Sequence, residues 1–330
     1  MSSAASGTVV VITGASSGIG RATALAFAER GASVVLASRN ARALEEAARE
    51  CRDRGARAIA VPTDVTDAAA VDALARRTLE EFGRFDVWVN DAAVGVFARF
   101  EDTPADVWRQ VVETNLFGYV HGARVALAHF RARGRGVLVN LDSLNASAPQ
   151  PYTSAYVVSK YAVRGLSESL RMELSLDHAD DIHVCNVMPA TIDTPFFQHA
   201  ANYTGRAVRA MPPVYPPEQV ARTIVHLVEH PRREVIVGGA GRVFAAEHAL
   251  APALYERMGA RLVDRMQLQD RPAPPTEGIV FAPPADGGSV HGGWLSRRTL
   301  VMRRAALVGI GALVALPALV RWRRRARAIA

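Results

Sequence analysis

Lysine is nearly absent from this chain. Of its 330 residues 39 are Lys or Arg, and Lys160 is the single lysine among them. The position of this one ammonium group therefore requires an explanation. Tyr156 precedes Lys160 by four residues, a spacing that places both side chains on one face of a helix.

Cysteine is also scarce. Cys51 and Cys185 lie far apart and suit no metal-binding spacing, so we expect no metal site and a reduced, intracellular protein. The start of the chain, "MSSAASGTVVVITG", lacks the basic residues of a secretion signal and runs directly into an apolar segment. Hydrophobic residues make up 49% of the chain, and this fraction excludes wholesale disorder.

The net charge of +7 is concentrated at one end of the chain. Residues 291–330 contain nine arginines and no acidic residue, which leaves the rest with 30 basic and 32 acidic residues. A nearly neutral body has no basic face for nucleic acid, so we expect no nucleic-acid partner. The charge pattern indicates a folded body with a separate basic tail.

Short apolar runs alternate with longer amphipathic segments up to about residue 240. The runs are rich in β-branched residues and apolar on both faces, as a parallel sheet covered by helices requires. The segments between them, such as 41–54 and 67–82, are long enough for crossover helices. The pattern predicts an α/β fold over residues 1–240, with a doubly wound parallel seven-stranded sheet. The expected strands are residues 8–13, 33–38, 57–62, 85–90, 136–141, 182–188 and 234–239.

The pattern changes after residue 240. Residues 244–269 have helical spacing, with Leu250, Leu254, Met258 and Leu262 at four-residue steps on one face, and they predict a helical extension over 241–270. Residues 271–293 are rich in Pro and Gly and are interpreted as a linker.

Residues 294–330 are interpreted as a membrane anchor with basic flanks. The sixteen uncharged residues 305–320 reach about 24 Å as a helix, against about 30 Å for a hydrocarbon core, and the flanking arginines can snorkel. We therefore expect a cytoplasmic body held on membrane lipid by this tail. An interfacial or re-entrant anchor and a buried core helix are the alternatives, and the flanking charges do not choose an orientation.

The stretch "TGASSGIG", residues 13–20, follows the first expected strand and opens a helix. Gly14, Gly18 and Gly20 allow a tight turn in which the backbone approaches a pyrophosphate at the helix N-terminus. A purely structural glycine turn is the alternative, but this strand–turn–helix context favours nucleotide binding.

The end of the second expected strand bears on the choice of nucleotide. It reads Ser38-Arg39, without the carboxylate that would bind the 2′-hydroxyl of NAD. A guanidinium grips a phosphate well, so the sequence favours NADP(H) over NAD(H), unless Arg39 is only a surface charge. Asp64 is expected to bind the adenine amino group or to cap the next helix, and Asp67 is the better candidate for the cap.

Tyr156 and Lys160 together suit proton transfer. A tyrosine hydroxyl has a pKa near 10, and a nearby cation brings that pKa closer to neutrality. Lysine offers a compact ammonium group that can pass protons, whereas the rigid fork of arginine does not release one. This difference explains why one lysine would persist in a chain that otherwise uses arginine.

The chain resembles the short-chain dehydrogenase/reductase family over roughly residues 7–240. The glycine-rich turn and "YVVSK" match the two best-known motifs of the family. Ser143, thirteen residues before Tyr156, matches its catalytic serine, and Asn115 in "ETNLFG" matches its catalytic asparagine. The segment "MPATIDTPF", residues 188–196, resembles the loop that holds the nicotinamide and the phosphates.

The resemblance implies a mechanism and a homo-oligomer. Tyr156 donates a proton to the substrate carbonyl, Ser143 stabilises the oxyanion, Lys160 lowers the Tyr156 pKa, and Asn115 holds a water of the proton relay. The expected cofactor-binding residues are Gly14, Ser16, Ser17, Gly18, Ile19, Gly20, Ser38, Arg39, Asp64, Val65, Asn90, Ala92, Tyr156, Lys160, Pro189, Ile192 and Thr194.

The sequence departs from the family pattern at three places. "NDAA" at 90–93 replaces Asn-Asn-Ala-Gly, so that Asp91 and Ala93 change the turn after the fourth strand. Asp142 puts a carboxylate beside Ser143, where the family has paired serines. Ala190 replaces the glycine of the Pro-Gly loop. None of these changes removes a catalytic group.

The substrate is expected to be a mostly apolar carbonyl or alcohol. The candidate lining residues are aromatic or aliphatic, with residues 196–217 as a lid, although such side chains also serve simple packing. The candidates are Phe97, Leu144, Tyr152, Phe196 and Phe197. A second hypothesis is a catalytically silent NADPH-binding sensor or scaffold at a membrane.

Overall fold

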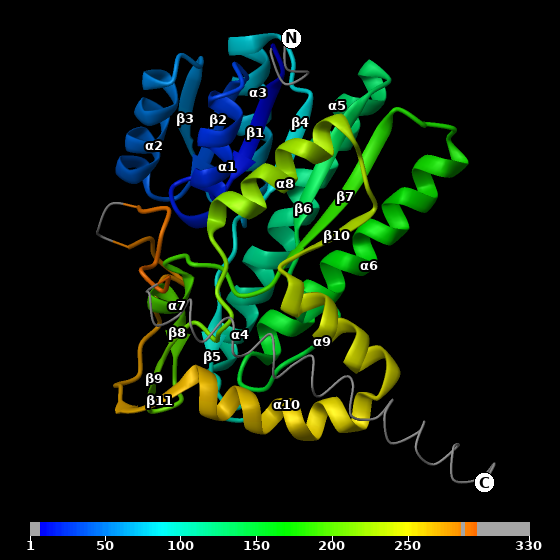
Figure 1. Cartoon of the computed structure of the whole chain (residues 1–330). Helices are drawn as coiled ribbons and strands as arrows, with labels where there is room; N and C mark the ends of the chain where they lie inside the picture. The colour runs from blue at the N-terminus through cyan, green and yellow to red at the C-terminus, as the bar shows by residue number, and fades with distance from the viewer. Residues whose placement is uncertain (1–6, 285–287, 296–330) are drawn as a thin grey trace, which may run out of the picture.

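A seven-stranded parallel sheet forms the body of the computed structural model, which describes residues 7–284 and 288–295. The strand order is β10-β7-β6-β4-β1-β2-β3 (Figure 1). All seven predicted strands are present, with ends that differ from the prediction by at most two residues. The strands are β1 (Val9–Thr13), β2 (Ser33–Ser38), β3 (Ala58–Pro62), β4 (Val87–Asn90), β6 (Gly136–Leu141), β7 (Ile182–Pro189) and β10 (Glu234–Val237).

Helices cover both faces of the sheet. Along β1, Val10 and Ile12 pack into one hydrophobic core while Val9 and Val11 pack into the other, which is why the strands are apolar on both sides. One core includes α1, α2 and α8, and the second includes α3, α5 and α6 (Figure 1). Their bounds are α1 (Gly18–Ala28), α2 (Ala41–Asp53), α3 (Ala68–Phe82), α5 (Gly118–Arg133), α6 (Ser154–Leu176) and α8 (Pro217–Glu229).

Polar caps fix where two of these helices begin. The side chain of Asn40 accepts a hydrogen bond from the Ala43 amide at the start of α2 (3.1 Å). Asp67 accepts one from the Ala69 amide at the start of α3 (2.8 Å), which confirms Asp67 rather than Asp64 as the cap. Asp64 instead accepts from the amide and the hydroxyl of Thr66.

Shorter elements gather below the carboxyl ends of the central strands (Figure 1). A π-helical turn, Glu113–Phe117, joins α4 to α5, and β5 pairs with β8 in a small separate sheet. The bounds of these elements are β5 (Val96–Phe97), α4 (Ala105–Val112), a 3-10 turn (Leu144–Ala146), α7 (Phe196–His199), β8 (Ala201–Asn202) and β9 (Arg206–Val208).

The predicted extension over 241–270 is helical, but a break separates Leu250 from the apolar residues that were expected on the same face. The structure has two helices, α9 (Gly239–Leu250) and α10 (Pro252–Gln267). Proline lacks a backbone N–H and disfavours the helical conformation of the residue before it, so the first helix ends ahead of Pro252. Strand β11 (Leu268–Pro272) then pairs antiparallel with β9 and ties the extension to the body.

Residues 276–284 and 288–295, here called the strap, include most of the segment interpreted as a linker and the first two residues of the segment interpreted as an anchor. The strap is hydrogen-bonded to the body rather than detached from it: the Gly18 amide donates to the Ser289 carbonyl (2.8 Å), and the Trp294 amide donates to Asp193 (2.6 Å). Proline and glycine predict irregular backbone, but carbonyl oxygens in such a segment still accept bonds from arginines and amides of the body.

Of the expected anchor, residues 294–330, only residues 294 and 295 are described, and its uncharged run 305–320 lies outside the described residues. Across the described ranges, the structure has no helix of the length and apolarity that a membrane span needs.

Candidate active site

The glycine-rich turn brings three segments into contact. Gly14 has a φ of +72°, and a Cβ there would lie 2.8 Å from the Ala92 nitrogen. Gly18 has a φ of +54°, and its Cβ would lie 3.2 Å from Cγ2 of Thr194. A side chain at either position would be strained by the positive φ and crowded by Ala92 or Thr194. Glycine therefore allows the turn to pack closely against these two segments.

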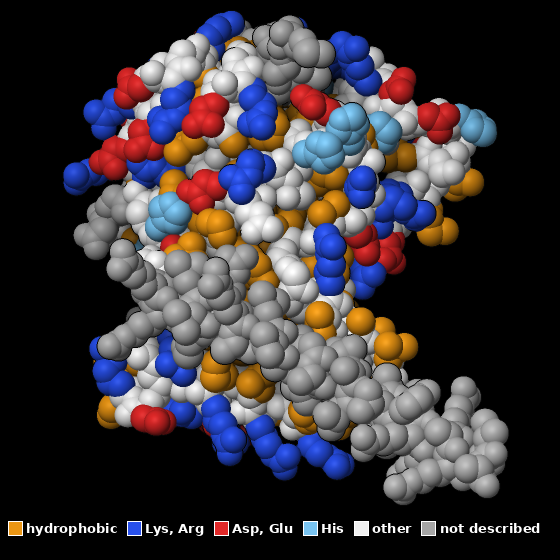
Figure 2. Space-filling view, in the orientation of Figure 1, with side chains coloured by type: hydrophobic (Ala, Val, Ile, Leu, Met, Phe, Trp, Pro, Cys, Tyr) orange, Lys and Arg blue, Asp and Glu red, His pale blue; other side chains and the backbone are white. Residues whose placement is uncertain are grey.

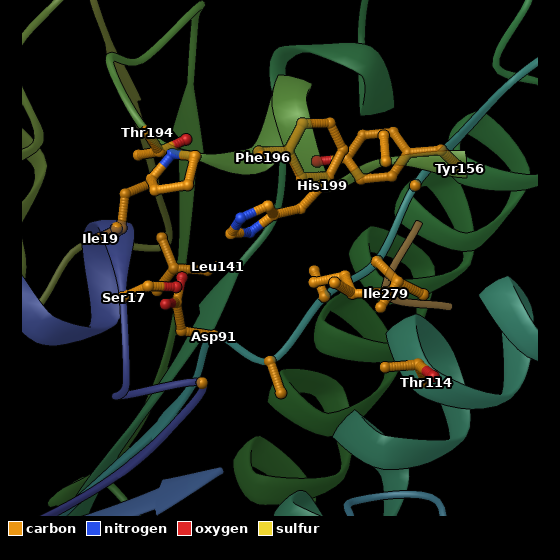
Figure 3. A pocket seen from close by; sticks show the side chains of 18 of the residues that line it. Ser17, Ile19, Asp91, Thr114, Leu141, Tyr156, Thr194, Phe196, His199 and Ile279 are labelled. Carbon is orange, nitrogen blue, oxygen red and sulfur yellow. The ribbon is translucent and has the colours of Figure 1, made fainter. Parts of the chain in front are cut away.

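A cavity of about 290 Å³ extends from this turn to Tyr156. Figure 3 shows side chains of the turn, of the residue 194 loop and of α6 and α7 around the same space. Most of the expected site residues line it. They are Gly14, Ser16, Ser17, Gly18, Ile19, Ser38, Arg39, Asp64, Val65, Ala92, Ser143, Tyr156, Lys160, Pro189, Ile192 and Thr194.

Three expected site residues do not line the cavity: Gly20, Asn90 and Asn115. A Cβ at Gly20 would lie 2.5 Å from the Gly14 carbonyl oxygen, so this glycine lets α1 pack against its own turn. The Asn90 amide donates to Asn140 (2.9 Å) and accepts from the indole of Trp88 (2.8 Å). Asn90 thus joins β4 to β6 and does not face a nucleotide.

Asn115 is fully buried in the π-helical turn. Its Oδ1 accepts from the Val94 amide (2.9 Å), and its Nδ2 donates to the Val94 carbonyl (2.9 Å) and to Ser159 Oγ (3.2 Å). These contacts fix the segment after β4 against α6. The expected contact of Asn115 with a relay water stays a prediction.

Lys160 lies at the bottom of the cavity and is only 1% exposed. Its Nζ donates to the Leu141 carbonyl (2.6 Å) and to the Tyr119 hydroxyl (3.3 Å), and it lies 5.6 Å from the centre of the Tyr156 ring. Tyr156 is one helical turn earlier on α6, so the two side chains share the face predicted from their spacing. Burial lowers the pKa of Lys160 to about 8, against the raising influence of Asp142 and Asp91.

The pKa of Tyr156 differs from the expectation. Burial raises it above its ordinary value, while the Ser143 hydroxyl lowers it and Asp142 and Asp91 raise it further. The Lys160 ammonium donates to Leu141 and Tyr119, and the expected lowering of the Tyr156 pKa by Lys160 stays a prediction.

Two carboxylates, Asp91 and Asp142, influence Lys160. In the sequence they stood out only as departures from the family pattern. Asp142 Oδ1 accepts from the Ser143 amide (2.9 Å), and Oδ2 has no hydrogen-bond partner among the described residues. Burial raises the pKa of Asp142 to about 7 and that of Asp91 to about 8, while Lys160 lowers both. Both groups line the cavity, so its charge changes close to neutral pH.

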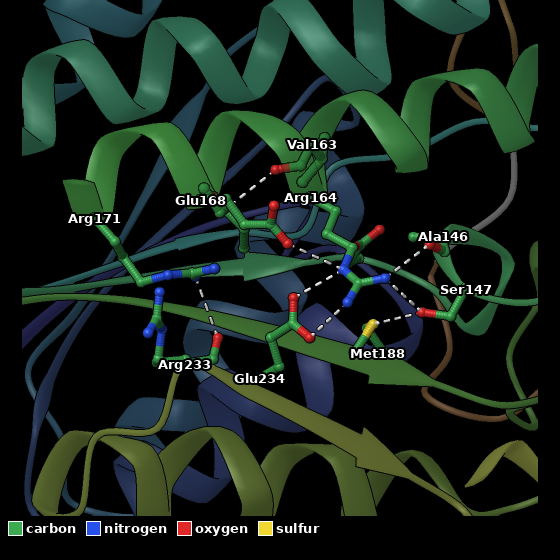
Figure 4. Close-up of polar contacts among 12 residues, drawn as sticks. Ala146, Ser147, Val163, Arg164, Glu168, Arg171, Met188, Arg233 and Glu234 are labelled. Carbon is green, nitrogen blue, oxygen red and sulfur yellow. Dashed lines mark hydrogen bonds and ion pairs between the residues drawn. The ribbon is translucent and has the colours of Figure 1, made fainter. Parts of the chain in front are cut away.

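A polar cluster around Arg164 holds the loop that carries Ser143 (Figure 4). The guanidinium pairs with both oxygens of Glu234 (2.9 and 3.0 Å) and donates to Ser147 Oγ (3.1 Å). A two-point contact of this kind fixes geometry as well as charge. Because Arg164 follows Lys160 by one turn of α6, the cluster ties the Ser143 loop to the helix of Tyr156 and Lys160.

Arg39 lies where the strap crosses the cavity. Its guanidinium donates to the carbonyls of Ile279 (2.6 Å) and Val280 (3.2 Å), and burial lowers its pKa against the influence of Asp64. The hydroxyl of Ser38 is buried without a hydrogen-bond partner among the described residues. The sequence could not reveal the strap contacts, because they join residues about 240 positions apart.

The other end of the cavity is largely apolar. Phe97, Leu144, Phe196 and Phe197 line it as expected, whereas Tyr152 points its hydroxyl at Asp264 (2.8 Å) outside the lining. The expected lid, 196–217, folds into α7, β8 and β9, and it contributes His199 and Met211 to the wall. Gln267 of α10 also lines the cavity, and it gave no signal in the sequence.

The family model for short chain dehydrogenases matches residues 8–203. The chain belongs to the short-chain dehydrogenase/reductase family. The match spans the glycine turn, Ser143, Tyr156 and Lys160, and so includes most of the residues around the cavity. The resemblance stated from the motifs is confirmed at the level of the family.

Curated relatives cover most of the chain. An uncharacterised oxidoreductase of Bacillus subtilis, YxnA, is 37% identical over 321 residues, which is 95% of this chain and 89% of the relative. Cis-4-hydroxycyclohexanecarboxylate dehydrogenase of Sinomonas cyclohexanicum is 37% identical over 223 residues, 66% of this chain and 88% of the relative.

Solved structures of the same fold bind nicotinamide nucleotides. A family member from Burkholderia phymatum, in complex with NAD, has a TM-score of 0.70 at 28% identity and covers 76% of this chain and 96% of its own. An alcohol dehydrogenase from Thermococcus sibiricus, complexed with 5-hydroxy-NADP, has a TM-score of 0.61 at 28% identity and covers 70% of this chain and 95% of its own. The protein is thus an oxidoreductase of a fold that binds a nicotinamide cofactor.

Proposed function

We propose that the protein is an NADP(H)-dependent oxidoreductase that interconverts a carbonyl and an alcohol on a mostly apolar substrate, with Tyr156 as the general acid and base. The observation that carries the proposal is one continuous cavity with the glycine turn at one end and Tyr156, Ser143 and Lys160 at the other. The apolar wall beyond Tyr156 supports the substrate class. The Sinomonas relative, named for a hydroxylated ring substrate, supports an alcohol as one reactant.

The residues present fit a dinucleotide. Gly14 and Gly18, where a Cβ would crowd Ala92 and Thr194, allow the tight turn that borders the cavity, and Ser38 offers a buried hydroxyl without a partner among the described residues. Ser16 and Ser17 would hold the pyrophosphate and Thr194 would contact it from the opposite wall. The Gly18 amide donates to the Ser289 carbonyl of the strap (2.8 Å), so it would have to leave that carbonyl to join them. Bound there, the reduced cofactor would supply the hydride that the substrate carbonyl carbon accepts.

The chain supplies the proton and the charge. The Tyr156 hydroxyl gives its proton to the carbonyl oxygen in reduction and takes it back in oxidation. The Ser143 hydroxyl donates a hydrogen bond to the same oxygen. Lys160 provides the buried positive charge beside the tyrosine, and Asn115 and Arg164 position the surrounding segments.

The preference for NADP(H) rests on the end of β2. The residues there are Ser38 and Arg39, so no carboxylate repels a 2′-phosphate, and Arg39 lines the cavity. The two structural neighbours, one with NAD and one with an NADP derivative, leave both cofactors open. Residues 294–330 stay a predicted anchor for membrane lipid, and a homo-oligomer stays an expectation from the family.

Consumption of NADPH tests the proposal. Wild-type protein and Tyr156→Phe are assayed with a panel of lipophilic aldehydes and ketones, and NADPH binding is measured for both by fluorescence titration. We expect turnover by the wild type, loss of at least about 100-fold in the variant, and similar NADPH affinity. Binding without turnover above the variant would favour the silent sensor or scaffold, and absence of binding would refute both functions.

A further inference from the structure

The outer side of α10 exposes a stripe of large apolar side chains. Leu254, Met258 and Leu262 are 52%, 42% and 41% exposed, and their four-residue spacing places them in one row. Leu250, at the corner where α9 ends, extends the row and is 86% exposed. A contiguous apolar surface of this kind marks contact with another apolar phase or molecule.

Arginines border the same stripe. Arg257, Arg261 and Arg265 are exposed and also follow one another at four-residue steps. Successive residues of a helix turn by about 100°, so each arginine points within about 60° of Leu254. Figure 2 shows a row of basic side chains along the lower edge of the molecule, where Figure 1 places α10. We call these three arginines with Leu254, Met258 and Leu262 the α10 face.

The acidic residues of α10 do not neutralise this face. Asp264 accepts hydrogen bonds from Tyr152 (2.8 Å) and Arg206 (3.1 Å), on the side that packs against the body. Glu256 lies about 160° around the helix from Leu254. The α10 face is therefore both apolar and positively charged.

We propose that the α10 face docks on the surface of a lipid bilayer that contains anionic phospholipid. A helix with long apolar side chains beside arginines is complementary to such a surface, because its apolar groups enter the headgroup boundary while its cations meet the anionic lipids. An apolar partner surface would account for the stripe but not for the uncompensated arginines.

The sequence that follows Trp294 also supports a lipid bilayer as the partner. The Trp294 ring contacts Phe197 of α7 (5.9 Å between ring centres), and α7 lies at the same end of the molecule as α10 (Figure 1). Residues 296–330 follow from there, with nine arginines and the uncharged run 305–320. The sequence beyond Trp294 thus has the same combination of apolar and basic residues as the α10 face.

The same helix forms part of the cavity wall. Gln267 at the end of α10 lines the cavity, and the Tyr255 hydroxyl donates to the Pro149 carbonyl (3.1 Å), which fixes α10 to the segment before α6. A bilayer on the outer side of α10 would lie next to the apolar end of the cavity. This consequence rests on the proposed function, whereas the docking itself does not.

A fluorophore at position 258 reports docking directly. Met258→Cys in the full-length chain is labelled with an environment-sensitive dye, which is selective because Cys51 and Cys185 are 0% and 1% exposed. Leu79→Cys is the matched control: Leu79 is 36% exposed and belongs to α3, which Figure 1 draws at the opposite end of the molecule from α10. Vesicles of phosphatidylcholine with phosphatidylserine carry a doxyl quencher on the upper acyl chain.

We expect the dye at 258 to shift to shorter wavelength and to be quenched on these vesicles, while the dye at 79 is not. Arg257→Gln, Arg261→Gln and Arg265→Gln combined should weaken the quenching at 258, because each arginine near an anionic surface contributes about fivefold to binding. Arg49→Gln, Arg76→Gln and Arg222→Gln, which remove the same charge from exposed positions elsewhere, should leave it unchanged.

Three results would overturn the proposal. A dye at 258 that is already shielded without vesicles would show that the tail of the chain or a second copy covers the face. If the protein binds the vesicles but the dyes at 258 and 79 are quenched equally and weakly, another part of the chain holds it on the membrane and the α10 face does not dock. Protein that does not bind the vesicles at all would exclude a bilayer as the partner. None of these readings depends on turnover, so failure of the docking is distinct from failure of the proposed function.

Discussion

Replacing Lys160 by arginine tests why this chain retains one lysine. The substitution keeps a positive charge but changes its shape and its ability to release a proton. In the structure the ammonium occupies a site that is 1% exposed, and two of its three N–H groups point to Leu141 and Tyr119. One donor therefore remains for the Tyr156 side of the cavity.

The magnitude follows from these contacts. Fitting a guanidinium into a closed site built for an ammonium group should cost about 1–3 kcal/mol of stability, as overpacking does in other buried sites. In a domain of this size each kcal/mol lowers Tm by about 2–4 °C, so the variant should remain folded. Loss of the positioned proton-transfer partner should lower kcat by about 10²–10⁴-fold.

The assay is kcat for carbonyl reduction, with thermal melting and NADPH titration on the same samples. Arg222→Lys, an exchange of the same two residue types on exposed α8, is the matched control and should change neither kcat nor Tm. A Lys160→Arg variant with turnover within a few-fold of the wild type would mean that the lone lysine has no chemical role.

Three further predictions concern the cofactor, the pH profile and the tail. Exchanging Ser38-Arg39 for Asp-Leu should weaken NADPH and improve NADH, a swing of at least about 1.5–3 kcal/mol; equal NADPH affinity by fluorescence titration would make Arg39 a surface charge only. Asp142→Asn removes the carboxylate that most raises the Lys160 pKa, so that pKa should fall below about 8. The fall of kcat at high pH, where Lys160 loses its proton, should then move to lower pH. If it does not move, deprotonation of Lys160 is not its cause. Full-length protein should pellet with membranes, resist a high-salt wash and be released by detergent, while protein ending at residue 295, which keeps only the α10 face, should be released by a high-salt wash; release of the full-length protein by salt alone would reduce the tail to an electrostatic contact.

The sheet was predictable because its signal is local. Each strand is a short β-branched run that is apolar on both faces, and Val9 to Ile12 show in the structure why both faces must be apolar. The same holds for the helix cap at Asp67. Pro252 is also a local signal, because proline disfavours the helical conformation of the residue before it. The four-residue spacing of apolar residues on both sides of Pro252 predicted only a helical extension, without this break.

The cavity was predictable where residue chemistry is specific. Tyr156, Lys160 and Ser143 meet because their spacing and the parallel sheet bring them to one edge. Asn90 was expected as a ligand from the resemblance to the family, but its partners, Trp88 and Asn140, are fixed by tertiary packing.

The strap could not be predicted, because its binding depends on distant contacts. The Pro and Gly content of the strap predicts irregular backbone but not which residues the strap contacts. Arg21, for example, pairs with Glu50 through two nitrogens (2.9 and 3.2 Å) and donates to the Gly288 carbonyl (2.5 Å), a contact across more than 260 residues. The raised pKa values of Asp91 and Asp142 likewise follow from burial, and the burial of these two residues could not be predicted from the sequence.

Transfer of deuterium from NADPH that carries deuterium at both hydrogen positions of the nicotinamide C4 tests the central claim most directly. A carbonyl compound that supports NADPH consumption is reduced with the labelled cofactor, and the alcohol is examined by mass spectrometry with Tyr156→Phe in parallel. The account predicts an alcohol one mass unit heavier, with the label on the carbinol carbon, from the wild type, and almost none from the variant. Unlabelled alcohol, or equal labelling by Tyr156→Phe, would contradict hydride transfer with Tyr156 as the acid.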